Sequence, residues 1–258
     1  METAGADAVL DADAPRRRSS LERVHRLFSA FDYDHSRLTL SDLSRRAGLP
    51  LSTTHRMVAD LIDLGMLDRD DLDQLSIGVE VWKFGLLTPS AHGIQRVALP
   101  FMQDLYATTG LAVHLGIRQG DQATIVENLR PRSAERERPH IGQRNPLHVT
   151  AVGMAILASS EAEIQEEYLA KLRDVFDAAT AEAIRRELAQ TRANGFSVSS
   201  RLAAPRIAIG APLLNPSGRP LGALSIVVPE GTAPQPYGHL VRSTVRAVQR
   251  TAWEHGVA

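Results

Sequence analysis

One face of the helix predicted at 52–64 carries small and hydrogen-bonding side chains, namely Ser52, His55, Arg56 and Ala59. At 100° per residue these positions lie opposite the apolar ones, so they point away from a core. Small side chains let a helix approach base edges closely, and an arginine can reach guanine or phosphate. We therefore predict DNA contacts at this face and at the helix before it, at Ser41, Ser52, Thr53, His55 and Arg56.

Three consecutive arginines, Arg16 to Arg18, precede the first predicted helix. Arg17 and Arg18 are candidates for contacts to the DNA backbone or minor groove. A solvated run of charge before a helix is the alternative, and the sequence does not choose between the two. The first fifteen residues are rich in Ala and Asp without periodicity, which predicts a disordered tail that ends at residue 18.

Enzyme chemistry has few candidate residues. The sequence has no Gly-x-Ser-x-Gly elbow, no phosphate-cradling glycine loop and no His-Glu-x-x-His pair. His114, His140 and His148 could meet in space as a metal site, but their spacing is open and the chain has no cysteine. We expect no catalytic residue, metal or cofactor, and a histidine-based metal enzyme stays as an alternative.

The composition is that of a soluble globular protein. The 258 residues suit about two domains. No apolar run approaches the ~18 residues of a membrane span. The amino terminus is acidic where a signal peptide needs positive charge, so we expect a cytoplasmic protein. The net charge of -1 means that any DNA-binding surface is local.

Two short helices must position the DNA-contacting face of the helix at 52–64. The earlier one has an apolar stripe from Leu21 to Phe31, with Ser20 as its predicted cap. Thr39 caps the second, and Gly48 supplies the left-handed residue that ends it. The core side of the helix at 52–64 is predicted to hold Thr54, Met57, Val58, Leu61 and Leu64.

A hairpin is predicted after the third helix, from Met66 to Gly78. Its turn contains Asp70, Asp71 and Asp73, so this wing should not hold phosphate as a basic wing would. Three helices followed by a wing form a winged helix, in which the third helix enters the major groove.

The second half predicts an antiparallel sheet with flanking helices. Strands are expected at 112–118, which alternates as a half-buried strand does, and at 123–129, 207–214 and 221–228. Helices are expected at 94–109, 150–158 and 162–172, then one capped by Thr180 and ended by Gly195, and one at the carboxyl terminus.

In order and spacing, these segments resemble the IclR-type bacterial transcriptional regulators. The similarity covers Ser19 to about His255 and rests on the run from Ser19 to Asp70, GVEVWKFG, GQRNPLHVTAVGMAILA, ELAQTRANGFSV and GRPLGALSIVVP. It implies an α+β chain with an N-terminal winged helix-turn-helix domain joined by a linker helix to a GAF- or PAS-like effector-binding domain. The expected boundaries are 1–18 for the tail with its basic arm, 19–77, 78–92 and 93–258.

The resemblance also implies an effector pocket between the sheet and the loop before the helix at Thr150. Carried over by position, its residues are Asn145, Ala151, Val152, Ser199, Ala208, Ser225 and Val227. Close packing of small residues is the alternative explanation of these positions. Where many relatives carry acids, this chain has Ser199-Ser200-Arg201, so Arg201 joins the predicted effector residues. Leu51 stands where relatives often have a lysine or arginine.

The expected function is a ligand-responsive regulator that binds a double-stranded DNA operator as a homodimer or a dimer of dimers, without a membrane. Its effector is predicted to be a small organic carboxylate, because a helix amino terminus and arginine both suit that group. Val79, Trp82 and Phe84 in the linker are too apolar for an exposed connector and are expected to pack across the dimer. A DNA-binding architectural protein without an effector is the other alternative.

Overall fold

The amino-terminal unit begins with a capped helix. The computed structural model describes residues 19–32, 34–87, 89–131, 140–201, 205–254 and 256. Ser19, rather than the predicted Ser20, caps α1 (Ser20–Ser29). The Ser19 hydroxyl accepts a hydrogen bond from the Glu22 backbone, and the Glu22 carboxylate accepts one from the Ser19 backbone. This reciprocal capping box satisfies two free helix donors and so fixes the start one residue earlier.

A turn at Gly48 joins α2 (Leu40–Ala47) to α3 (Leu51–Asp63). The prediction of Thr39 as cap and Gly48 as left-handed terminator is confirmed, with φ of 59° at Gly48. The hairpin is confirmed as β1 (Leu67–Arg69) and β2 (Leu75–Ile77), which pair antiparallel. Leu64 was expected in the core but is exposed, because α3 ends at Asp63.

The linker contains parts of two helices. The chain divides into compact units between Phe84 and Gly85. That division falls within α4 (Val79–Leu86), and Pro89 then starts α5 (Pro89–Thr109). Proline suits a first helical position because it needs no hydrogen bond there. The second unit therefore begins its helix before Gly93, the predicted start of the effector domain.

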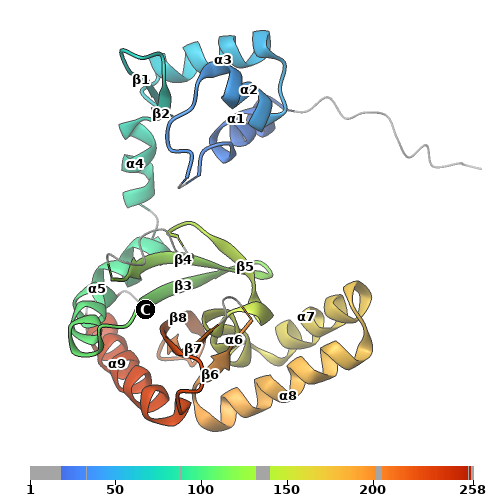
Figure 1. Cartoon of the computed structure of the whole chain (residues 1–258), viewed down its shortest axis with the longest axis vertical. Helices are drawn as coiled ribbons and strands as arrows, with labels where there is room; N and C mark the ends of the chain where they lie inside the picture. The colour runs from blue at the N-terminus through green and yellow to red at the C-terminus, as the bar shows by residue number, and fades with distance from the viewer. Residues whose placement is uncertain are drawn as a thin grey trace, which may run out of the picture. The chain divides into compact units, whose positions relative to one another are not determined.

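The second unit is built on one antiparallel sheet of six strands in the order β5-β4-β3-β8-β7-β6. Helices cover it on both sides in Figure 1: α5 and α9 (Pro234–Glu254) on one face, and α6 (Ala151–Ala158) with its neighbours on the other. The strands are β3 (Val113–Gln119), β4 (Gln122–Leu129), β5 (Arg144–Pro146), β6 (Ser197–Ser199), β7 (Arg206–Leu214) and β8 (Pro220–Pro229).

The prediction of a half-buried strand at 112–118 was wrong. Residues Val113 to Ile117 of β3 are all buried, because helices cover both faces of this central strand. Val113, Leu115 and Ile117 face the α5–α9 core. His114 and Gly116 therefore face α6, since alternate residues of a strand point to opposite sides.

Two longer helices follow α6. They are α7 (Ala162–Val175) and α8 (Ala178–Asn194). Asp177 caps α8 by accepting from the Thr180 backbone at 2.6 Å, so the prediction of Thr180 as the cap was wrong. Gly195 ends the helix, as predicted. Among the residues that the structure describes, no helix has both the length and the apolar character of a membrane span.

Candidate nucleic-acid and ligand sites

The outward face of α3 carries the predicted DNA-contacting side chains. Ser52, His55 and Arg56 are exposed, and Thr53 is half-buried. The opposite face packs into the core of the unit through Thr54, Met57, Val58 and Leu61. Burial of that face fixes which residues α3 presents to solvent.

Arg56 differs from the other arginines of the amino-terminal unit. Its guanidinium makes no hydrogen bond or ion pair within residues 19–32 and 34–87, whereas Arg23 has a partner. The other pairings are Arg26 to the Gly48 carbonyl, Arg46 to the Ala30 carbonyl and to Asp32, Arg37 to Asp70, Arg45 to Asp42, and Arg69 to Asp73. Most arginines of this unit thus make hydrogen bonds or ion pairs within the fold, whereas Arg56 is available to a ligand.

The acidic wing has a structural role that the sequence did not reveal. Asp70 accepts hydrogen bonds from the backbones of Leu72 and Gln74, both at 2.9 Å, and from Arg37 at 2.8 Å. The bond from the Gln74 backbone is the largest of the effects that lower the pKa of Asp70. Its carboxylate therefore builds the turn. Ser41 is exposed at the start of α2, and Arg17 and Arg18 lie outside the described residues.

The second candidate site lies where the amino end of α6 meets the sheet. The Ser197 hydroxyl donates to the Ala151 carbonyl at 2.6 Å, and the Ser199 hydroxyl donates to the Val149 carbonyl at 2.8 Å. A Cβ on Gly210 would lie only 2.8 Å from the Ala151 oxygen. Glycine at this position therefore lets α6 rest directly on β7.

The strand register brings most of the predicted effector residues together. Ser199, Ala208 and Val227 are neighbours in one row across β6, β7 and β8. Ser225 lies in the next row, between Gly210 and His114. Because Ser197 and Ser199 face the α6 segment, their row partners Ala208, Val227 and Ser225 share that face. Ala151 and Val152 form the first turn of α6 above it.

Asn145 stands apart from that group, whereas Arg201 lies at its edge, where its backbone N–H donates to the Ser199 hydroxyl at 3.4 Å. Asn145 is on β5, three strand positions from β8, which is roughly 14 Å at ~4.8 Å per strand. Its Nδ2 is buried and has no hydrogen-bond partner within the described part of the chain. The Arg201 guanidinium donates to the His148 carbonyl at 3.2 Å and forms an ion pair with Glu187. The role of each stays a prediction.

The three candidate metal-binding histidines do not converge. His148 is hydrogen-bonded to the Tyr168 hydroxyl through Nδ1 at 2.8 Å, and His140 lies beside Arg130. Across the described ranges no three His, Asp or Glu side chains are placed to hold a metal ion. The alternative of a histidine metal site thus has no support in this geometry.

His114 is a buried histidine that the sequence suggested only as part of the alternative metal site. It is 6% exposed and faces α6 next to Ser225. Burial, aided by the charge of Arg130, lowers its pKa to about 4, so its imidazole is neutral at physiological pH. The signal available in the sequence was strand alternation, which places His114 opposite Val113 and Leu115.

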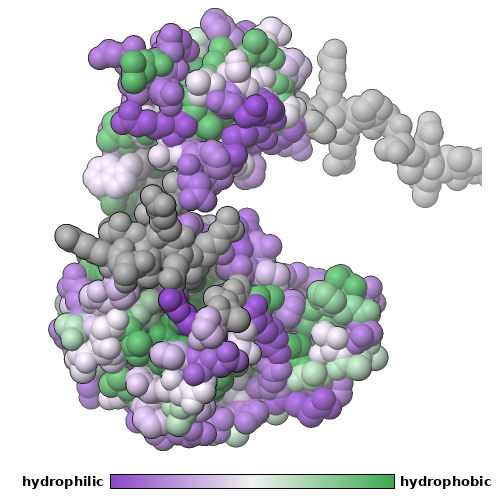
Figure 2. Space-filling view, viewed as in Figure 1, coloured by the Kyte–Doolittle hydropathy of each residue, from purple (hydrophilic) through white to green (hydrophobic). Residues whose placement is uncertain are grey.

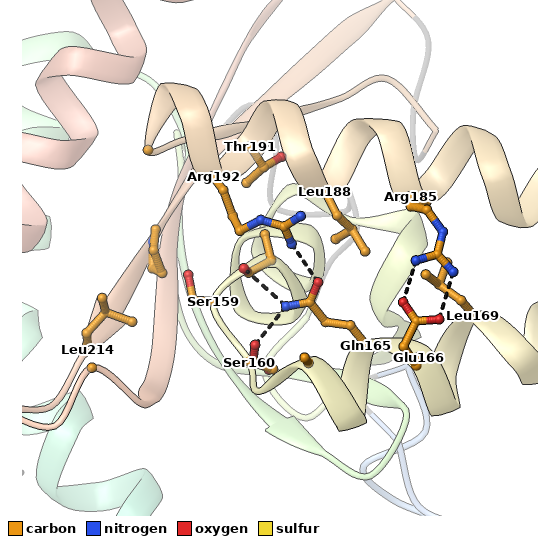
Figure 3. Close-up of a pocket in the computed structure, with 15 residues that line it drawn as sticks. Ser159, Ser160, Gln165, Glu166, Leu169, Arg185, Leu188, Thr191, Arg192 and Leu214 are labelled. Carbon is orange, nitrogen blue, oxygen red and sulfur yellow. Dashed lines mark hydrogen bonds and ion pairs between the residues drawn. The ribbon is translucent and has the colours of Figure 1, made fainter.

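A separate groove lies at the other end of α6, between α7, α8 and the β7–β8 turn (Figure 3). Its volume is about 700 Å³. Arg185 in the groove is paired with Glu166, and Arg192 donates to Gln165 Oε1 at 2.6 Å. None of the predicted effector residues lines this groove.

Comparison with known proteins identifies both units. The IclR helix-turn-helix domain model matches residues 20–71, and the model of the bacterial transcriptional regulator IclR C-terminal matches residues 88–252. The HTH-type transcriptional regulator KipR of Bacillus subtilis strain 168 is 32% identical over 195 residues, 73% of this chain and 78% of that protein. The glycerol operon regulatory protein of Streptomyces coelicolor is 28% identical over 246 residues, 91% and 96% of the two chains.

A solved structure of a homolog supports the same family assignment. An IclR homolog from Microbacterium hydrocarbonoxydans, complexed with 4-hydroxybenzoate, has a TM-score of 0.81 and 28% identity and covers 90% of this chain and 98% of its own. The chain belongs to the IclR family of bacterial transcriptional regulators, which bind DNA through a helix-turn-helix domain and carry a C-terminal effector domain.

Proposed function

We propose that α3 reads a double-stranded operator through Ser52, Thr53, His55 and Arg56, with Ser41 of α2 and the Arg17–Arg18 arm on the DNA backbone. The observation that carries this proposal is the unpartnered guanidinium of Arg56 on the exposed face of α3, within the described unit. A side chain that the fold does not use can bond a base without breaking an internal contact. An arginine can donate hydrogen bonds to both major-groove acceptors of guanine, O6 and N7.

The regulator works as a homodimer or a dimer of dimers, because one winged helix covers only a half-site. The apolar side chains of α4 support this assembly: Trp82 is 62% exposed and Phe84 is 61% exposed. Hydrophobic surface is visible along the side of the unit where the wing and α4 lie (Figure 2). We assign residues 19–77 to DNA binding, 78–92 to the link and 93–258 to effector binding and oligomerisation.

The effector is a small organic carboxylate that binds between the sheet and the amino end of α6. The backbone N–H groups of Ala151 and Val152 donate to no acceptor among the described residues, since Thr150 caps Gly153 instead. Free N–H groups at a helix amino terminus favour an anion. The 4-hydroxybenzoate bound by the Microbacterium homolog supports a carboxylate.

Arg201 belongs to the rim of this site. Its ion pair with Glu187 is partly exposed, so the guanidinium can bond a carboxylate only by sharing or leaving Glu187. Arg206 starts β7 and lies two residues before Ala208 on the same strand. The proposal needs no catalytic residue and no cofactor.

The test is a titration of the operator complex of the full-length protein with 4-hydroxybenzoate and a panel of short-chain acids. We expect at least one acid to change operator affinity, and Arg201→Ala to raise its half-effective concentration about tenfold, which is ~1.4 kcal/mol. Arg192→Ala removes the same charge outside the site and is the control. A protein that purifies with a neutral ligand and ignores every acid would overturn the carboxylate assignment.

A further inference from the structure

We infer that His114 determines specificity in the effector site, by hydrogen bonding an uncharged hydroxyl or carbonyl group that the ligand carries at a distance from its carboxylate. This inference rests on the proposed function. It adds a residue to the site and narrows the ligand to a hydroxy- or oxo-substituted acid.

The sheet register places His114 in the floor of the site. His114 on β3 lies directly opposite Ser225 on β8, and Ser225 lies opposite Gly210 on β7. Gly210 is the residue on which Ala151 of α6 rests. Gly210, Ser225 and His114 thus form one row across β7, β8 and β3, and the first turn of α6 contacts this row at Gly210.

Burial and hydrogen bonding single out two side chains of this row. His114 is 6% exposed and Ser225 is 2% exposed. Neither side chain forms a hydrogen bond to any other part of the chain that the structure describes. On the same face, Ser197 and Ser199 are both bonded to backbone carbonyls next to α6. Buried polar groups almost always have a partner, so two adjacent ones without a protein partner point to a ligand.

The charge state of His114 decides which ligand group it can take. Burial and the nearby Arg130 hold the pKa of His114 at about 4. No carboxylate contributes to that shift, and Ser225 and Asn128, its neighbours on the adjacent strands, carry no charge. A neutral imidazole has one donor and one acceptor nitrogen, which suits a hydroxyl or carbonyl better than a carboxylate. This is compatible with the carboxylate at the free N–H groups of α6, where the proposed function puts it.

A site built to hydrogen-bond a hydroxyl should discriminate against the analogue that lacks it, because the imidazole would then be left buried and unpaired. Matched ligands that differ only in this hydroxyl measure the effect. We choose 4-hydroxybenzoate against benzoate, and 4-hydroxybutyrate against butyrate, titrated calorimetrically into the full-length protein. We expect the hydroxylated acid of at least one pair to bind at least tenfold more tightly.

His114→Leu should abolish this preference and leave the affinity for the unsubstituted acid within about threefold. His114→Gln, which keeps a donor and an acceptor, should retain part of it. If His114→Leu does not fold, Ser225→Ala takes its place and should reduce the same ratio. Ser159→Ala, in the groove of Figure 3, is the control and should leave the ratio unchanged.

The outcomes separate this inference from the proposed function. Acids that bind the wild type without a hydroxyl preference, or a preference that survives both His114→Leu and Ser225→Ala, overturn the role of His114 and leave the carboxylate effector standing. If none of the four acids binds while operator binding is intact, the inference about His114 is overturned, and the carboxylate assignment is overturned only by the outcome given for the wider panel of acids.

Discussion

The Ser197 hydroxyl on β6 donates a 2.6 Å hydrogen bond to the Ala151 carbonyl at the first turn of α6. Both groups are buried, so this bond ties the sheet edge to the helix whose amino end forms the predicted effector site. The same hydroxyl also lies 3.2 Å from the Gly210 carbonyl. Together with the bond from the Ser199 hydroxyl to the Val149 carbonyl, it holds the amino end of α6 on the sheet.

Ser197→Ala should lower the free energy of unfolding by about 1 kcal/mol, because it removes a buried hydrogen bond between the sheet and α6. Urea denaturation of the full-length protein, followed by circular dichroism, measures the change. Ser159→Ala removes a hydroxyl near the other end of α6 and should cost less than about 0.5 kcal/mol. Equal effects of the two substitutions would contradict the role of Ser197.

Arg56→Ala should weaken operator binding by about 1–3 kcal/mol and relax base preference at one position. The loss of operator affinity should occur without a loss of folding stability, because Arg56 makes no hydrogen bond or ion pair within the described amino-terminal unit. Fluorescence anisotropy with the operator and with single-base variants measures both effects. Arg192→Ala is the charge-matched control in the other unit. Unchanged affinity for all of these duplexes would exclude α3 as the reading helix.

Deletion of residues 1–18 tests the arginine arm separately. If Arg16, Arg17 and Arg18 each contact a phosphate, the slope of log affinity against log salt should fall by about 2.7, at ~0.9 per contact. The measurement is operator binding at several salt concentrations. An unchanged slope would favour the alternative of a solvated charge run.

Several local features of the fold could be predicted from the sequence, although the caps of two helices were placed on Ser20 and Thr180 instead of Ser19 and Asp177. The Thr39 cap, the Gly48 terminator and the wing each depend on a few adjacent residues, and each was confirmed. The full burial of β3 depends on α5 on one face and α6 on the other, which are distant in the sequence, so alternation alone suggested a half-buried strand.

In the candidate sites, too, some features follow from adjacent residues and others from contacts between distant segments. The outward face of α3 follows from helical periodicity, and the structure places it as expected. What periodicity could not show is that the fold occupies the neighbouring arginines and leaves Arg56 available. The environment of His114 likewise required the register of β3 with β8, which no short stretch of sequence contains.

Trp82→Glu should raise the dimer dissociation constant at least tenfold, which is ~1.4 kcal/mol. A charge at this position would have to be buried if α4 packs against a second copy. Sedimentation equilibrium measures the change. Lys83→Gln, on the next residue of α4, breaks only an exposed ion pair with Glu80 and is the control. A dimer that tolerates both substitutions equally would place the interface elsewhere.

The stability of the protein should depend on His114 below neutral pH. Its pKa is about 4 in the folded chain, against 6.5 for an ordinary histidine, so the unfolded chain binds more protons between these values. The contribution of the neutral His114 to the free energy of unfolding is therefore present above pH 6.5 and is lost as the pH falls from 6.5 towards 4. Between pH 7 and pH 5 the loss from this residue should be about 2 kcal/mol.

Urea unfolding of the wild type and of His114→Gln at both pH values measures this loss. The wild type should lose about 2 kcal/mol more than the variant, because glutamine does not titrate while all other groups remain the same. His55→Gln, which removes an exposed histidine from α3, should follow the wild type. If His114→Gln and wild type lose the same free energy, the imidazole is already charged or solvated in the folded protein. The neutral hydrogen-bonding role assigned to it would then be wrong.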